Sequence, residues 1–391
     1  MAELNDYSGP FRPDLKLSDF SKEFLLRLIP HWQWTWFQMD AAWFDGILDR
    51  YGPDFAWYVN GKVYAQEVPE RCNRRYAKMF NIKRDNVVDS LKVLQLPLDN
   101  TMGGQYPTTY DIRDENHAVV SVWGCPNLEW YEHQAPERIR PMCQINEIQM
   151  IRGYVCNPNI EVKALRLPPR QSPEEMACQW EHSIDVPEGV RVRSTDEVVD
   201  ETTEIPELDD YSGPFYPNLR HKNLSKSFLL KLLDSWQFVL LIMNQAYFDW
   251  TSDRHGRAAA VEINREAWSR VTQRCNRRYL RMAGIELNTL LDSLKCLQLP
   301  MANSMGRLYP AEYDIKNENH VVMTIRDCRS LGYWERRGHV PEMTEAVCHA
   351  SEREAIQRYL LNPNIEVTPL QLPPRRSRDD AACRWEFKLR G

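Results

Sequence analysis

The chain has 391 residues, of which 43% are hydrophobic and 27% are charged. At about 100–200 residues per domain this length predicts two or three domains, and the ordinary composition excludes a disordered chain, a collagen and a coiled-coil rod. A net charge of −6 without a basic tail disfavours nucleic acid as a partner. No stretch approaches the ~18–20 apolar residues of a membrane span, and the N-terminus lacks a secretory-signal pattern. We therefore expect a cytoplasmic protein with no membrane contact.

Internal repetition is the strongest signal in the sequence. The repeated segments are DYSGPF at 6–11 and 210–215, CNRRY at 72–76 and 275–279, DSLK at 89–92 and 292–295, LQLP at 94–97 and 297–300, NPNIEV at 157–162 and 362–367, and LPPR at 167–170 and 372–375. The offset stays between 203 and 205, which is far too long for a solenoid repeat. We predict a first unit at 1–184, an acidic linker at 185–208 and a second unit at 209–391. Tandem copies commonly pack about a pseudo-two-fold axis, so we expect a pseudo-dimeric monomer or a homodimer.

The predicted elements follow the same order in both copies. Each copy opens with a helix that carries an aromatic stripe at helical spacing, Trp32, Trp36, Met39 and Trp43 in the first copy and Trp236, Met243 and Tyr247 in the second. Antiparallel strands follow, with one short helix inserted among them. The last strand is clearest at 383–389, where apolar and charged residues alternate. The predicted fold class is α+β, and the seven stripe residues are candidates for the wall of a ligand pocket. The alternative is that they only fill the core.

The chain has ten cysteines, and four of the five in the first copy have counterparts in the second. Cys72 and Cys275 lie on an apolar helical face and are predicted to be core residues. The other three are expected to converge on one end of a sheet, namely Cys125, Cys143 and Cys178 in the first copy and Cys328, Cys348 and Cys383 in the second. Three thiolates suit a tetrahedral zinc site. Glu147 and Glu352, each four residues after the helical cysteine, are candidates for the fourth ligand; Glu132 and Glu335 also repeat. No CxxC spacing is present, so a reactive thiol and simple core packing stay open as alternatives.

The closing segments of each copy resemble a known superfamily. Cys328, Cys348, NPNIEV, LPPR and CRWEF together resemble 4-vinyl reductase-like domains and L-2-amino-thiazoline-4-carboxylic acid hydrolase-like proteins. The resemblance spans both copies and implies a compact, commonly paired unit around a hydrophobic cavity. In related phenol-sensing domains three cysteines and a glutamate hold zinc, which implies the cysteines named above as ligands. The last two cysteines lie farther apart here than in that pattern, the glutamate has no matching position, and no catalytic residue can be carried over.

Three functional hypotheses follow from these patterns. The first is a zinc-binding protein with aromatic-lined cavities for a small organic molecule. The alternative is a zinc-dependent enzyme, a hydrolase or a thiol or group transferase, acting on a small organic substrate. Its acid–base candidates repeat as Asp111 and Asp314, Glu115 and Glu318, and His117 and His320, although a solvated turn at the repeated ENH segment is the favoured explanation. The third is binding of a partner or an anionic ligand through the arginines at 71, 74 and 75 and at 274, 277 and 278. These arginines are more simply a solvated helix face.

Overall fold

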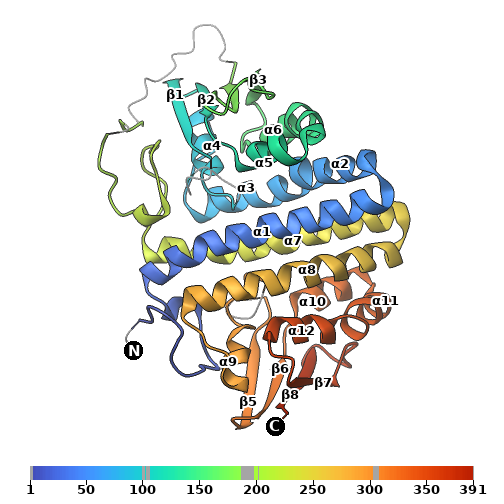
Figure 1. Cartoon of the computed structure of the whole chain (residues 1–391). Helices are drawn as coiled ribbons and strands as arrows, with labels where there is room; N and C mark the ends of the chain where they lie inside the picture. The colour runs from blue at the N-terminus through green and yellow to red at the C-terminus, as the bar shows by residue number, and fades with distance from the viewer. Residues whose placement is uncertain are drawn as a thin grey trace. The chain divides into compact units, whose positions relative to one another are not determined.

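The structure, a computed structural model, describes residues 3–98, 102, 106–185, 198–200, 202–302 and 308–390 (Figure 1). The chain forms two compact units, each named here after the repeat whose sheet it contains. The first-repeat unit is Tyr51–Leu232, and the second-repeat unit combines Met1–Arg50 with Leu233–Gly391. Much of the predicted acidic linker, residues 186–197 and 201, lies outside the described residues.

The first-repeat unit consists of helices followed by an antiparallel sheet. Its helices are α2 (Pro53–Lys62), η2 (Val63–Glu67), α3 (Val68–Met79), α4 (Val87–Leu94), α5 (Pro126–Gln134), η4 (Pro136–Arg138), η5 (Arg140–Asn146), α6 (Glu147–Tyr154) and η6 (His221–Asn223). Its strands are β1 (Thr108–Asp114), β2 (His117–Val122), β3 (Glu161–Arg166) and β4 (Cys178–Ser183), in the order β1-β2-β4-β3. All pairings are antiparallel.

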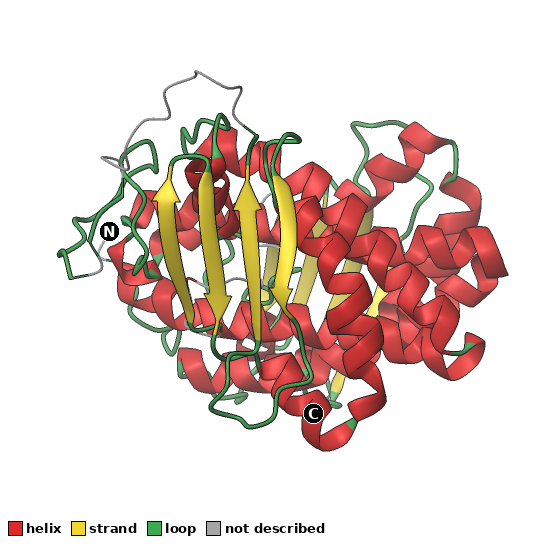
Figure 2. Ribbon diagram, turned by 90° about the horizontal axis from the view of Figure 1, so that it is seen from above, coloured by secondary structure: helices red, strands yellow, loops and turns green. Residues whose placement is uncertain are grey.

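The second-repeat unit has the same plan. Its helices are η1 (Leu17–Asp19), α1 (Lys22–Tyr51), α7 (Lys226–His255), α8 (Arg257–Ala283), α9 (Leu290–Lys295), α10 (Arg329–Arg337), α11 (Val340–Met343), η7 (Thr344–His349) and α12 (Glu352–Leu360); the last residue of α1 and the first seven of α7 belong to the other unit. Its strands are β5 (Ala311–Asn317), β6 (His320–Ile325), β7 (Ile365–Gln371) and β8 (Cys383–Leu389), in the order β5-β6-β8-β7. Figure 2 shows how the four strands of one sheet lie edge to edge with helices behind them. The predicted α+β class, with helices preceding each sheet, is confirmed.

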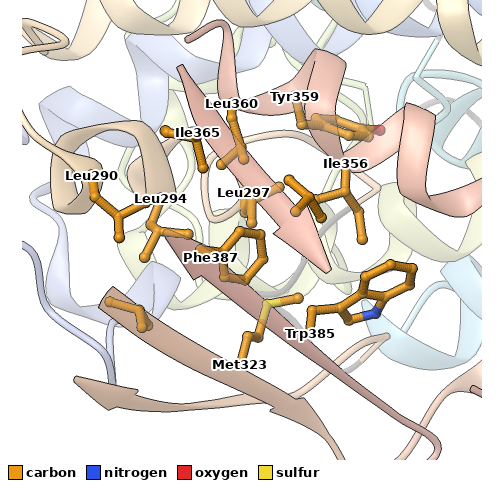
Figure 3. Close-up of a cluster of buried hydrophobic side chains, with 12 residues drawn as sticks. Leu290, Leu294, Leu297, Met323, Ile356, Tyr359, Leu360, Ile365, Trp385 and Phe387 are labelled. Atoms are coloured by element: carbon orange, nitrogen blue, oxygen red, sulfur yellow. The ribbon is translucent and has the colours of Figure 1, made fainter. Parts of the chain in front are cut away.

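Alternation along β8 explains how the second sheet attaches to its helices. Trp385 and Phe387 are 1% and 0% exposed, whereas the charged residues between them lie on the other face. In Figure 3 both aromatic side chains pack in one cluster with Ile356 and Tyr359 of α12. Burying a large apolar side chain stabilises a fold by about 1.5–3 kcal/mol. The period-two pattern therefore fixes the face of β8 that carries the core.

The repeated DYSGPF segment binds the DSLK–LQLP segment of the opposite copy. In the second-repeat unit the Tyr7 hydroxyl donates to Gln298 Oε1 at 2.7 Å, and Lys295 Nζ donates to the Gly9 carbonyl at 2.7 Å. The ring of Phe11 packs edge-on against Tyr313, with ring centroids 5.1 Å apart. The first copy's opening segment thus completes the second copy's sheet unit.

The reciprocal contacts occur in the first-repeat unit. Tyr211 donates to Gln95 Oε1 at 2.6 Å, and Lys92 Nζ donates to the Gly213 carbonyl at 2.7 Å. The Phe215 ring lies edge-on to a strand tyrosine at 5.1 Å, as in the other unit. Each copy therefore lends its opening segment to the other.

The first copy has one residue more than the second in a long helical region, and this region is interrupted by a π-helix only in the first copy. In the second copy α8 runs unbroken over 27 residues, whereas the first copy divides the same region into α2, the π-helix η2 and α3. The first copy has one residue more between Gly52 and Cys72 than the second has between Gly256 and Cys275. A π-bulge is the usual way in which a helix absorbs an extra residue. The insertion therefore accounts for η2.

Helix α7 is long and apolar enough to cross a membrane by length and composition alone. Of its most apolar 18-residue window, 61% is buried inside the protein. Within the second-repeat unit α1, α7 and α8 run side by side (Figure 1), and the rings of Trp43 and Tyr247 stack 5.7 Å apart. These contacts are typical of a core helix.

Candidate functional site

The second-repeat unit contains a cavity of about 210 Å³ between its helices and the inner face of its sheet. Its wall comes from α7, α8, α10, α11, η7, α12 and the strands β5, β6 and β8, with connecting segments between them. The large apolar side chains that line it are Phe248, Trp268, Met323, Trp334, Met343 and Trp385. Most of the wall is therefore aromatic or apolar, which is the usual composition of a small-molecule site.

Three cysteines from three separate elements line this cavity. Cys328 caps the N-terminus of α10 and accepts a hydrogen bond from Leu331 N at 3.4 Å. Cys383 opens β8 and accepts from Trp385 Nε1 at 3.3 Å, and Cys348 lies in the π-helix η7. The structure thus brings together the three cysteines that the sequence singled out in the second copy.

All three thiols are in their neutral form at physiological pH. Burial raises the pKa of Cys328 and of Cys383 to about 12, and burial together with the neighbouring Glu352 raises the pKa of Cys348 further. A nucleophilic or redox-active cysteine needs the opposite shift, because the thiolate is the reactive species. The geometry therefore disfavours covalent chemistry by these cysteines.

Two glutamates line the cavity: Glu354 is exposed and forms an ion pair with Arg358, whereas Glu352 is only partly exposed. It begins α12, and in the described residues it has neither a hydrogen bond nor an ion pair. Burial raises the pKa of this carboxyl from 4.5 to about 7. Strong desolvation of a titratable group in a cavity is a recognised mark of a functional site.

Trp334 supplies a second unpartnered polar group. Its side chain lines the cavity and is 6% exposed, and its indole N–H has no acceptor within the described part of the chain. A buried donor without an acceptor costs about 1–3 kcal/mol. The cavity thus holds a donor and a carboxyl group that a bound molecule can satisfy.

The corresponding region of the first-repeat unit is closely packed. Asn146, the counterpart of Ser351, donates to the Trp57 carbonyl at 3.0 Å and to Asn60 Oδ1 at 3.2 Å. A Cβ added to Gly153 would lie 2.4 Å from the carbonyl oxygen of Ala65. Helix α6 therefore rests directly on the backbone of η2.

Arginines replace glycines at this junction in the second copy. Counting from the aligned motifs, Gly61 corresponds to Arg265 and Gly153 to Arg358. Both arginines line the cavity. Long side chains thus stand where the first copy brings two helices into backbone contact, which explains why the two units differ here.

The first-copy cysteines share the environment of their counterparts. Cys125 accepts from Leu128 N at 3.4 Å and Cys178 from Trp180 Nε1 at 3.2 Å. Burial raises the pKa of Cys125 to about 12 and also raises the pKa of Cys143 and of Cys178. Cys143 packs in a small apolar cluster on η5. These thiols belong to a packed core.

The prediction of a zinc-binding protein, with a zinc-dependent enzyme as its alternative, is wrong. In the described ranges no group of three or more His, Cys, Asp or Glu side chains could hold a metal ion. This applies to both predicted ligand sets, Cys125, Cys143, Cys178 and Glu147, and Cys328, Cys348, Cys383 and Glu352. The physical reason is geometric, because these side chains, which come from separate elements, do not gather closely enough around one point to ligate an ion. Four of the six sulfur atoms instead accept hydrogen bonds within the protein.

The aromatic stripes predicted as a pocket wall lie in the helical core of the second-repeat unit. None of the seven residues lines the cavity, and all are at most 1% exposed: Trp32, Trp36, Met39, Trp43, Trp236, Met243 and Tyr247. Their polar atoms are used internally. Trp32 Nε1 donates to the Leu299 carbonyl at 3.2 Å, and the Tyr247 hydroxyl donates to Asp40 at 2.6 Å.

Other repeated motifs have structural partners. The LPPR arginines bind the repeated glutamates in paired hydrogen bonds, Arg170 with Glu132 at 2.9 Å and Arg375 with Glu335 at 2.8 and 2.9 Å. The repeated histidines each pair with a glutamate on the neighbouring strand of the same sheet, His117 with Glu181 and His320 with Glu386. None of these residues lines the cavity. The arginine of CNRRY at 278 stacks over the Trp34 ring at 4.3 Å, as expected of a helix-surface residue.

Glu352 links the stability of the protein to pH. Because its folded-state pKa is raised to about 7, the ionised carboxylate disfavours the folded state above that pH. We expect Glu352→Gln to increase the free energy of unfolding at pH 8 by about 2–3 kcal/mol. The gain shrinks as the pH falls from 7 toward 4.5, where Glu352 is protonated in both states. Urea unfolding at pH 5, 6, 7 and 8 measures this.

The control for this experiment is Glu345→Gln, which changes an exposed carboxylate of η7 outside the cavity. Its effect should be small and should not follow pH in this way. A gain from Glu352→Gln that is the same at pH 5 and pH 8 would contradict the assignment of Glu352 as a buried, desolvated carboxyl group.

Comparison with known proteins adds one match. Residues 222–389 are similar to a family described as a family of unknown function (DUF6125). This match covers the second repeat, with the sheet and cavity described above, and less than half of the chain. No curated protein and no solved structure matches. The resemblance to 4-vinyl reductase-like domains, and the cytoplasmic location, stay predictions from the sequence.

Proposed function

We propose that the second-repeat unit binds a small organic molecule in its cavity. The molecule is held by protein side chains, without a metal ion. The observation that carries this proposal is the pairing of an apolar, aromatic wall with two unpartnered polar groups, the Glu352 carboxyl and the Trp334 indole N–H. A cavity of about 150 Å³ is large enough to hold benzene. The space of about 210 Å³ therefore suits a six-membered ring with a few further atoms.

The protonation of the cysteine thiols favours ligand binding over thiol catalysis as the function of this cavity. Their raised pKa values leave them as small apolar wall residues with polarizable sulfur atoms. The first-repeat unit then serves mainly as a structural partner in this proposal, because α6 packs on η2 in the corresponding place. Cavities filled by one ligand need only a few polar groups to fix its orientation.

Ala355→Met should block the cavity. Ala355 lines it on α12, and the first copy has Met150 at the same helical position, so the substitution is compatible with the fold. We expect at least a tenfold loss of affinity for a monocyclic aromatic probe, 2-phenylethanol, with little change in the melting temperature. Isothermal titration calorimetry on the full chain measures the affinity.

Ala350→Met is the matched control, because Ala350 is an exposed alanine just before α12 and does not line the cavity. It should bind the probe as the unaltered chain does. The proposal fails if the unaltered chain binds neither 2-phenylethanol nor its amine analogue 2-phenylethylamine. It also fails if Ala355→Met binds them as well as the Ala350→Met control does.

A further inference from the structure

We propose that the ligand of this cavity is a small organic amine whose ammonium group pairs with the Glu352 carboxylate while its apolar body lies against the aromatic wall. This inference rests on the proposed function, because it names the chemical class that the same cavity takes. Two observations carry it: the Glu352 carboxyl group lines the cavity, and no cationic side chain of the described residues is paired with it.

In the part of the chain that the structure describes, the groups around Glu352 offer it no internal counter-charge. The thiols of Cys328, Cys348 and Cys383, from α10, η7 and β8, face the same space and are neutral. Tyr309 bonds Ser330 at 2.8 Å, and Tyr359 bonds a threonine hydroxyl of α8. Neither tyrosine hydroxyl bonds the carboxyl group.

The two arginines that line the cavity are also not partners of Glu352. Arg358 forms an ion pair with Glu354 one turn away on α12. Arg265 is exposed on α8 and makes no ion pair within the described residues. Neither contributes to the pKa of Glu352, which burial alone sets. A carboxyl group enclosed in this way is best satisfied by a positive group that arrives with the ligand.

The charge of the ligand follows from the same argument. A neutral molecule leaves the carboxylate without a partner above pH 7, whereas an ammonium group supplies both charge and N–H donors. The aromatic side chains Trp268, Trp334 and Trp385 add apolar surface for its body, and aromatic rings also attract organic cations. A small amine with one ring satisfies the carboxyl group and fills the space.

The affinity for such an amine should depend on pH. Glu352 must be ionised to pair with an ammonium group, and burial alone holds its pKa at about 7. Binding at pH 6 therefore releases a proton from Glu352, and the affinity rises about tenfold between pH 6 and pH 8. Simple amines stay protonated throughout this range.

The test compares two probes of the same shape, 2-phenylethylamine and 2-phenylethanol, by calorimetry on the full chain at pH 6 and pH 8. Two buffers of different ionisation enthalpy report the proton release. We expect the amine to bind about tenfold more tightly at pH 8 than at pH 6, with proton release at pH 6. The alcohol should show no such gain. Glu352→Gln should lose tenfold or more in amine affinity while keeping its affinity for the alcohol.

The outcomes separate this inference from the proposed function. If the alcohol binds and the amine binds no more tightly, with no pH dependence and no effect of Glu352→Gln, the amine inference is overturned and the cavity still binds small molecules. If neither probe binds the unaltered chain, the proposed function fails as well. Glu345→Gln, an exposed carboxylate outside the cavity, should leave the amine preference unchanged.

Discussion

Replacing Gly153 by alanine is expected to lower the free energy of unfolding of the first-repeat unit by about 2 kcal/mol. The new Cβ would lie 2.4 Å from the carbonyl oxygen of Ala65 and 3.0 Å from its carbonyl carbon. Both atoms belong to the backbone of η2, so no side-chain rotation relieves the overlap, and overpacking of this kind typically costs 1–3 kcal/mol or more. Alanine is otherwise the better helix former by about 1 kcal/mol, so helix propensity alone predicts the opposite sign.

Urea unfolding followed by tryptophan fluorescence measures this effect. The matched control is Gly332→Ala in α10, where an added Cβ would meet only the Arg336 side chain at 3.6 Å. That change should stabilise the protein by about 0.5–1 kcal/mol. If Gly153→Ala stabilises the chain as Gly332→Ala does, α6 and η2 are not in the close contact described.

Lys295→Met should destabilise the second-repeat unit by about 2–4 kcal/mol. The lysine is 1% exposed in its side chain, and its Nζ donates to the Gly9 carbonyl at 2.7 Å and to Asp292 at 2.8 Å. It also lies 5.1 Å from the centre of the Tyr7 ring. Removing one partner of a buried ion pair costs about 3–5 kcal/mol, and the partial exposure of Asp292 moves the expected value toward the lower end.

Limited proteolysis adds a readout that is specific to this contact. Because Lys295 holds the opening segment at Gly9, its loss should speed cleavage within residues 3–20 as well as lower the urea midpoint. Lys388→Met, which changes an exposed lysine paired with Glu386, should cost less than about 1 kcal/mol and leave cleavage unchanged. Equal effects of the two substitutions would show that the buried lysine does not anchor the segment.

The sequence predicted the secondary structure well where a residue pattern is compatible with only one structure. The alternation of Trp385 and Phe387 with charged residues allows only a strand with one buried face, and β8 is such a strand. The aromatic stripe at Trp32 and Trp36 was ambiguous, because a core helix and a pocket wall have the same period. Only the packing of α1 against α7 and α8 shows that these residues are core.

The site was harder to predict because protonation is a property of the environment. The repeated cysteines pointed to the correct region, since Cys328, Cys348 and Cys383 line one cavity. The sequence gives no information on which N–H each sulfur accepts from, or on how closely the candidate ligands approach one another, and it is this spacing that decides against metal ligation. The replacement of Gly153 by Arg358 was a readable signal for an asymmetric cavity, once the two copies are aligned residue by residue.

The reciprocal exchange of opening segments could not be read from the repeat. Identical motifs in two copies show that DYSGPF and DSLK belong to one module, but they do not show whether the partners come from the same copy or from the other. Tyr7 with Gln298 and Tyr211 with Gln95 make equivalent bonds, each across copies.

This exchange sets the order in which the two units can fold during synthesis on the ribosome. The first-repeat unit, Tyr51–Leu232, is complete once Leu232 has emerged, whereas the second-repeat unit combines the first 50 residues with the last part of the chain. At about 5–20 residues per second, helix α1 waits roughly 10–50 seconds for α7 and α8, the helices of its own unit that cover it. During that interval its apolar face has no native cover, which makes the N-terminal 50 residues the segment on which a nascent-chain chaperone would act.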